Sequence, residues 1–208
     1  MSSARTASSA LNAPAAPTTD RGRRRREAVL DAAEQLFVER GFHGVSVDDL
    51  GAAAGISGPG LYRHFASKDA LLMAVLDRIW DRLRPAVEQR DAVDAAAALE
   101  LLLQAQLDLA FEQPAALVLL VRELKHLPDD YRALARRNHR RYVAAWATAI
   151  AAVRTEVASA EAHALALAVH GLIDSATLRR QAMPSEMGVE EHRAMLERLS
   201  RELLAAPV

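Results

Sequence analysis

Residues 45–70 read VSVDDLGAAAGISGPGLYRHFASKDA, and this stretch carries the signals for two short helices separated by a tight turn. Ser46 is suited to cap the first helix, because its hydroxyl oxygen accepts a hydrogen bond from a free backbone N–H. Asp49 stands where a capping box needs its second acceptor. Gly55 follows the last turn, where glycine adopts left-handed backbone geometry without a Cβ clash. We therefore expect a helix that begins after Ser46 and ends before Gly55.

The second helix of the pair is expected to begin at Ser57, which is again a good capping residue. Pro59 falls in the first turn, where its missing N–H costs no helical hydrogen bond. Leu61 and Phe65 are four residues apart, so they share a face that can pack back on the first helix. Two short helices joined by a glycine-containing turn form a helix-turn-helix, whose second helix enters the DNA major groove.

Helical patterns also flank this motif, with RREAVLDAAEQLFVERGF before it and SKDALLMAVLDRIWDRL after it. The whole arrangement resembles the TetR family of bacterial one-component regulators over residues 24–83. Its most specific parts are the spacing over residues 28–37, the turn AAGIS and the segment LYRHFASKDALL. The resemblance implies a dimer that binds a palindromic DNA operator and is released by a small-molecule effector.

The resemblance also implies which residues touch the DNA backbone. Family members use the tyrosine and histidine of this LYxHF segment and the lysine that opens the next helix, which are Tyr62, His64 and Lys68 here. Phenol, imidazole and ammonium groups all donate to phosphate oxygens. The alternative is that Tyr62 only packs and Lys68 is only solvated. Ser46 is expected to add a phosphate contact beside its capping role.

Base contacts are expected at the reading positions of the family. Arg63 is the best candidate for a bidentate guanine contact, with a phosphate contact as the alternative. Pro59 is suited to pack on a thymine methyl group. This sequence departs from its relatives because Gly58 and Gly60 present no side chain to a base edge, and because Gly51 replaces a common alanine. The expected reading positions are Val47, Asp48, Ser57, Gly58, Pro59 and Arg63, and Gly60 is also counted among the DNA-binding residues.

A run of arginines covers residues 21–26 and is interrupted only by Gly22. It stands at the start of the first helix, which we expect over residues 23–40. Positive charge is unfavourable at the start of a helix. We interpret the run, and Arg23, Arg24 and Arg25 in particular, as an arm on DNA phosphate or in the minor groove. The alternative is a solvated charge run.

Composition points to an all-α protein. The 208 residues are 51% hydrophobic and rich in alanine and leucine, with 4% aromatic residues and a net charge of −1. The near-neutral charge means that any DNA contact comes from a local patch. The chain has no cysteine, which excludes disulfides and thiol chemistry. No apolar run approaches the roughly 20 residues of a membrane span, so we expect a soluble cytoplasmic protein with no membrane partner.

Three segments are predicted. Residues 1–20 are expected to be a disordered arm, residues 21–84 the helix-turn-helix domain with its linking helix, and residues 85–208 an effector-binding and dimerisation domain. Pro85 should end or kink the linking helix. Further helices are expected over residues 92–112, 115–125, 128–155, 161–180 and 189–204.

The C-terminal part should hold a small-molecule effector, because an apolar helical domain with scattered polar groups suits a ligand pocket. His170 and Asp174 are one helical turn apart and are expected to pair. No metal site, cofactor or ordered set of metal ligands is predicted. The expected lining residues are Leu103, Leu107, Phe111, Leu119, Arg122, Glu123, His126, Tyr142, Trp146 and His170.

A second arginine cluster follows one predicted helix at Arg132, Arg136, Arg137, Arg140 and Arg141. One interpretation is a solvated face with salt bridges. The other is a site for an anionic effector such as an acyl-CoA, with its phosphates outside and its acyl chain within. The surrounding segment loosely resembles actinobacterial regulators of lipid metabolism.

Apolar stripes on the last two predicted helices are expected to form a dimer interface, as they do in the family. The alternative is that these stripes close the core of a single chain. The residues concerned are Leu165, Val169, Leu172, Ile173, Ala176, Met195, Leu196, Leu199 and Leu203.

Two other function classes remain as alternatives. An enzyme that uses the C-terminal helical cavity is one, although no nucleophile elbow, phosphate-binding loop or metal motif is visible. A DNA-binding or architectural protein with no ligand is the other.

Overall fold

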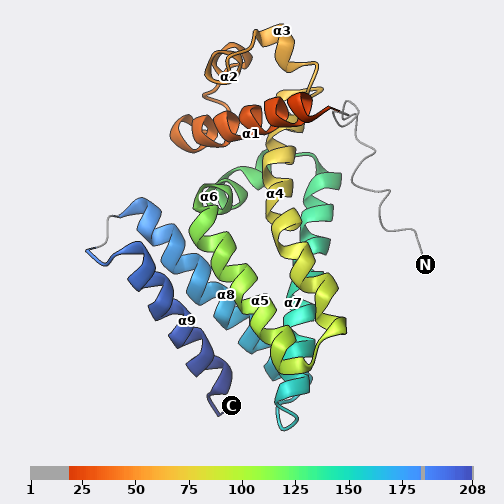
Figure 1. Cartoon of the computed structure of the whole chain (residues 1–208), viewed down its shortest axis with the longest axis vertical. Helices are drawn as coiled ribbons and strands as arrows, with labels where there is room; N and C mark the ends of the chain where they lie inside the picture. The colour runs from red at the N-terminus through yellow and green to blue at the C-terminus, as the bar shows by residue number, and fades with distance from the viewer. Residues whose placement is uncertain (1–18, 184–185, 208) are drawn as a thin grey trace, which may run out of the picture. The chain divides into compact units, whose positions relative to one another are not determined.

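The computed structural model describes residues 19–183 and 186–207, so most of the expected N-terminal arm lies outside the described residues. The described residues form helices and no strand, which confirms the all-α prediction (Figure 1). The α-helices are α1 (Asp20–Arg40), α2 (Val47–Ala53), α3 (Gly58–Leu61), α4 (Lys68–Gln89), α5 (Ala95–Glu112), α6 (Pro114–Glu123), α7 (Asp129–Val153), α8 (Ser159–Ala182) and α9 (Val189–Ala205). Short 3-10 helices, η1 (Arg90–Ala92) and η2 (Leu124–His126), follow α4 and α6. Within the described part of the chain, no helix is long and apolar enough to span a membrane.

The chain divides into two compact units, and the division differs from the boundary expected at residue 85. Within the described residues, the first unit comprises residues 19–78 and 118–134, and the second comprises residues 79–117, 135–183 and 186–207. Pro85 does not end α4, which continues to Gln89. Proline near the end of a helix removes only one late hydrogen bond, so α4 retains one further turn.

The first unit begins with α1, which buries Val29, Ala33 and Phe37 along one stripe. Leu50 of α2 and Leu61 of α3 are also buried, so the three helices close a small apolar core. Ser46 and Ser57 cap α2 and α3 as predicted, with their hydroxyl oxygens accepting from the N–H groups of Asp49 and Gly60.

Glycine is required where α2 meets α3. A Cβ atom on Gly51 would lie 2.9 Å from the backbone N of Gly58 and 2.9 Å from the backbone O of Ile56. The replacement of the common alanine by Gly51 therefore lets the two helices approach closely. Gly55 has a φ of 64°, the left-handed geometry expected at this turn.

Arg78 joins α4 to α1 through three carboxylates. Its guanidinium donates to Glu27 at 2.6 Å, to Asp31 at 2.8 Å and to Glu34 at 3.3 Å. Burial raises the pKa of Glu34, and Arg78 opposes that shift. Three acceptors for one guanidinium fix the rotation of α1 about its axis.

Residues 118–134 belong to the first unit, and this corrects four of the expected effector residues. Leu119 is buried there, and Arg122 is exposed and donates to the backbone O of Val38. Glu123 is buried near Gly41, and the ring of His126 lies 4.9 Å from the ring of His43. These contacts join the segment to α1 and to the loop that follows it.

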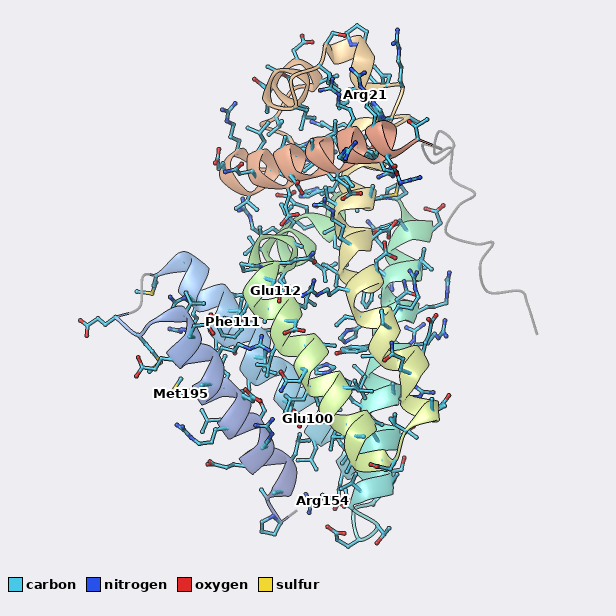
Figure 2. All side chains as sticks on the ribbon, in the orientation of Figure 1. Arg21, Glu100, Phe111, Glu112, Arg154 and Met195 are labelled. Atoms are coloured by element: carbon cyan, nitrogen blue, oxygen red, sulfur yellow. The ribbon has the colours of Figure 1, made fainter. Side chains whose placement is uncertain are left out.

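The second unit contains α5, α8 and α9 side by side (Figure 1). Their facing sides bury Leu103, Leu107, Val169 and Leu196. Arg154 follows the end of α7 and donates to the backbone O atoms of Leu204 and Ala206 at 2.9 and 2.8 Å; Figure 2 labels it there.

The dimer prediction is wrong for part of the apolar stripes, because the single chain already buries some of these residues. Leu165, Val169, Ile173 and Leu196 are core residues of the second unit. The rest remain partly exposed, namely Leu172, Ala176, Met195, Leu199 and Leu203. On α8 the exposed face instead carries Leu167, which is 45% exposed.

We expect Gly51→Ala to lower the free energy of unfolding by about 1–3 kcal/mol, because backbone atoms must move to admit the methyl group. Gly58→Ala is the matched control in the same corner. Its Cβ would meet the carboxylate of Asp48, a flexible side chain that can rotate away, so we expect a loss below about 1 kcal/mol. Denaturant titration measures both, and equal losses would contradict the close approach at Gly51.

Candidate nucleic-acid interface and effector site

The outer surface of α3 and the turn after it carries the expected DNA-contacting side chains. Tyr62 is 51% exposed, and Pro59 and Arg63 are also exposed. The hydroxyl oxygen of Ser57 accepts from the N–H of Gly60 at 3.2 Å, which leaves the Ser57 O–H proton to donate elsewhere. His64 is half-buried beside them. This face offers phenol, guanidinium, hydroxyl and imidazole groups to a polyanion.

Two of the expected DNA contacts are corrected by the structure. Gly58 is buried beneath Val47 and Asp48, so it presents no surface to a base. The Ser46 hydroxyl donates to Asp49 at 2.5 Å and accepts from the Asp49 N–H. A hydroxyl has one proton, so Ser46 has no free donor for a phosphate.

Lys68 has a structural role that the sequence did not reveal. Its ammonium group donates to the backbone O atoms of Phe42 and Val45, each at 2.9 Å, and lies 4.4 Å from the centre of the Phe42 ring. Two of its three N–H donors are therefore used within the first unit. At most one remains for the phosphate contact that the family resemblance implies.

The arginine run is helical, and its description as an arm is wrong because α1 begins at Asp20. Arg23, Arg24 and Arg25 are exposed in the first turns, and Arg23 pairs with Asp20. Arg26 is half-buried, with its guanidinium 4.5 Å from the centre of the Phe65 ring. Thr19 caps the helix by accepting from Gly22 at 3.2 Å. The run thus presents positive charge from a folded helix.

A buried polar cluster lies within the second unit, and it gathers three of the expected effector residues. The His170 ring is stacked on Tyr142, with centroids 5.2 Å apart and planes inclined by 16°. The Trp146 ring meets His170 edge to face at 5.0 Å. Tyr142 donates from its hydroxyl to the backbone O of Leu102 at 3.3 Å. These rings join α7 and α8, and the Tyr142 hydrogen bond joins α7 to α5.

The cluster is a poor environment for charge. Burial, together with the nearby His139, lowers the pKa of His170 to about 3. Burial raises the pKa of Tyr142 above its usual range. Burial also raises the pKa of Asp174 to about 6, although a hydrogen bond from Gln106 opposes that shift. His170 is therefore neutral at physiological pH.

The expected pair of His170 and Asp174 does not form. Asp174 instead accepts from the side-chain amide of Gln106 on α5 at 2.6 Å, and His170 Nε2 has no hydrogen-bond partner. Sequence analysis missed Gln106. Its one available signal was the pair of amides, Gln104 and Gln106, in the alanine- and leucine-rich stretch AAAALELLLQAQLDLAF.

The other expected lining residues separate into two groups. Leu103 and Leu107 are buried in the second unit, and Phe111 is half-buried, with its ring 5.6 Å from that of His192. Figure 2 labels Phe111 on α5. The remaining four lie in the first unit, as described above. The expected lining residues that lie in the second unit therefore belong to α5, α7 and α8.

The second arginine cluster is also divided. Arg132 lies in the first unit and donates to the backbone O atoms of Lys125 and Leu127. The other four, Arg136, Arg137, Arg140 and Arg141, are exposed on α7. Among the described residues these four have no ion pair, so the expected salt bridges are absent there and a face of unpaired positive charge remains.

Residues 29–75 match the model of the family described as bacterial regulatory proteins, tetR family. This range includes α2, α3 and their capping residues. This part of the chain is therefore similar to members of the TetR family. A curated TetR-type relative, the HTH-type transcriptional repressor KstR2 of Rhodococcus jostii, is 36% identical over 57% of this chain and 59% of its own length. Other curated relatives are matched over less of their length.

Solved TetR-like structures share the fold of the whole chain. A TetR-family regulator from Bordetella parapertussis superposes with a TM-score of 0.72 at 22% identity, over 86% of this chain and 93% of that one. The regulator FadR of Bacillus subtilis, solved in complex with stearoyl-CoA, gives a TM-score of 0.67 at 15% identity, over 88% and 99% of the two chains. These likenesses show that the similarity of fold extends beyond α2 and α3.

We expect Asp174→Asn to stabilise the protein at pH 8 and to have no effect near pH 4. The folded pKa of about 6 exceeds the unfolded value of about 3.9, so the folded state binds more protons and stability falls as the pH rises between them. Above that window the penalty is about 2–3 kcal/mol. Asparagine stays neutral, and its side-chain oxygen still accepts from Gln106.

Denaturant titration at both pH values measures this difference. His170 changes the stability of the wild type and of the variant by the same amount, so its effect cancels in the difference between them. Glu202→Gln, which neutralises an exposed carboxylate on α9, is the control and should leave stability unchanged at both pH values. Equal stabilisation by Asp174→Asn at pH 4 and pH 8 would show that packing, not charge, is responsible.

Proposed function

We propose that this protein is a one-component transcriptional regulator, and specifically a repressor, that acts in the cytoplasm and catalyses no reaction. It binds a palindromic DNA operator as a homodimer and leaves it when a small molecule binds the second unit. The observation that carries this proposal is the helix-turn-helix of α2 and α3, whose outer face exposes Tyr62 and Arg63 within the matched family domain.

The mechanism follows from the two-fold symmetry of such an operator. A dimer sets two copies of α3 about 34 Å apart, one turn of DNA. A ligand that binds better to a conformation with a different spacing shifts the population away from the DNA-bound form. α7 contributes Tyr131 to the first unit and Tyr142 and Trp146 to the second, so it is the continuous element through which ligand binding would act.

The effector we propose is an acyl-CoA or a related lipid derivative. The FadR neighbour was solved with stearoyl-CoA, and another neighbour, AibR, was solved with isovaleryl coenzyme A and operator DNA. In this chain, the second unit has an apolar interior suited to an acyl chain. The unpaired arginines at positions 136, 137, 140 and 141 supply positive charge for phosphate groups.

DNA binding is tested with duplexes selected from a random pool by the purified protein. We expect Arg63→Ala to weaken binding to the selected duplex by tenfold or more, on the order of 1–3 kcal/mol. Unfolding should be unchanged, because the exposed Arg63 side chain forms no ion pair or hydrogen bond within the described residues, and its backbone bond to Gly60 is retained. Lys68→Met should weaken binding and also lower the free energy of unfolding by about 1–3 kcal/mol, because two backbone carbonyls lose their donor.

Fluorescence anisotropy measures the DNA affinities, and denaturant titration measures the stabilities. Failure to select any duplex would reject the proposed function. If Lys68→Met changed only the salt dependence of binding, with stability intact, its main role would be the phosphate contact.

The dimer is tested through the exposed face of α8. We expect Leu167→Glu to convert a wild-type dimer to a folded monomer, because Leu167 is 45% exposed in the single chain and a charge there would be buried by a partner. Val153→Glu, at 43% exposure near the end of α7, is the matched control and should remain a dimer. Sedimentation velocity at micromolar concentration measures both, and a monomeric wild type would refute the dimer.

A further inference from the structure

Two buried nitrogen atoms in the second unit have no hydrogen-bond partner, the indole Nε1 of Trp146 and the imidazole Nε2 of His170. Trp146 is fully buried, His170 is 5% exposed, and their ring centroids lie 5.0 Å apart. An indole N–H can only donate, and a neutral imidazole nitrogen can donate as well. Buried donors are almost always paired, so two neighbouring exceptions need an explanation.

These two atoms lie in a polar layer between three helices. Tyr142 ties α7 to α5 through the backbone O of Leu102, and Gln106 ties α5 to α8 through Asp174. Trp146 lies close enough to the Tyr142 hydroxyl to oppose the rise in the pKa of Tyr142, but its Nε1 makes no hydrogen bond of normal geometry there. Neither tie reaches His170 Nε2. The neighbouring positions on α5 and α8 are the buried apolar residues Leu103, Leu107, Val169 and Ile173. The free donors thus stand within an apolar interior.

We propose that Trp146 and His170 bind an uncharged carbonyl oxygen, that of a thioester or ester, carried by a ligand with an apolar chain. One carbonyl oxygen has two lone pairs and can accept from both rings. The proposal rests on the proposed function, because it assigns a ligand chemistry to the effector unit. It goes further in naming the two side chains that recognise the carbonyl group and in excluding the free carboxylic acid as a ligand of equal affinity.

The charge of the site decides between a carbonyl and a carboxylate. Among the described residues, the groups that face the cluster offer little positive charge to an anion. Burial keeps His170 neutral, and burial also lowers the pKa of His139, whose ring lies 6.4 Å from that of His170. The arginines of α7 are on its exposed face. The nearest acidic group, Asp174, would repel an anion once ionised. A carboxylate would therefore lose its hydration without gaining a counter-charge, whereas a carbonyl needs only the two donors. A buried water is the rival occupant, because it would also satisfy both nitrogens.

The experiment compares three probes that share one chain length: methyl decanoate, decanoate and decane. Delipidated full-length protein is titrated with each, and binding is followed by calorimetry. We expect methyl decanoate to bind about tenfold or more tightly than either of the others. The chain has two tryptophans, so in Trp80→Phe protein the emission comes from Trp146 alone. Methyl decanoate should shift that emission to longer wavelength, as a new hydrogen bond to the indole does, and decane should not.

Trp146→Phe and His170→Phe each remove one nitrogen donor and keep an aromatic ring. Each substitution should lower the affinity for methyl decanoate about tenfold or more and leave the affinity for decane unchanged. Trp80→Phe is the matched control, because the Trp80 indole N–H is also buried and unpaired but makes no ring contact with the cluster in the described residues. It should bind methyl decanoate like the wild type. If one variant does not fold, the other variant and the emission shift still decide the matter.

Three results would overturn the proposal: no difference between the probes, tighter binding of decanoate, or variants that bind methyl decanoate like the wild type. The last result, with unchanged emission, would assign the two nitrogens to a bound water. None of these results bears on the selected DNA duplex, whose binding is measured separately. A protein that binds its duplex but fails these tests retains the proposed function and loses only the assigned ligand chemistry.

Discussion

The ammonium group of Lys68 donates to the backbone O atoms of Phe42 and Val45, and it lies over the ring of Phe42. These carbonyls belong to the loop between α1 and α2, and Val45 directly precedes the capping residue Ser46. The lysine, which opens α4, therefore fixes where α2 begins. The start of α2 in turn fixes where Gly51 meets Gly58, and so the position of α3. Loss of this one cation would release the loop that sets the positions of α2 and α3.

The parts of the fold that sequence predicted correctly are those fixed by local chemistry. Ser46, Ser57 and Gly55 act within a few residues of their own positions, so their roles could be deduced without the rest of the chain. The structural role of Lys68 could not be deduced from the sequence, because the backbone O atoms that accept from it lie 23 and 26 residues away. The assignment of residues 118–134 to the first unit failed for the same reason, since no local signal says which helix an apolar segment packs against.

Periodicity also left the last two helices ambiguous. An apolar stripe shows which residues share a face but not what covers that face. α8 is apolar on more than one side, so the chosen stripe at Leu165, Val169 and Ile173 proved to be core, while Leu167 stayed exposed. The same limit applies to His170, for which the local spacing suggested Asp174. The actual partner of Asp174 is Gln106, 68 residues away.

The polar layer makes the second unit less stable than an apolar layer in the same place would. Unpaired nitrogens on Trp146 and His170 and a buried Asp174 all lower the stability of the ligand-free fold. A ligand that pairs these nitrogens would recover that stability, and ligand binding would then stabilise the folded second unit by mass action. Such a ligand alters DNA binding only if it favours one conformation over another.

α7 supplies two rings of the polar layer and, through Tyr131, hydrogen bonds to Met73 and Asp77 of α4 in the first unit. Tyr131, Tyr142 and Trp146 thus belong to one helix, although they lie in different units.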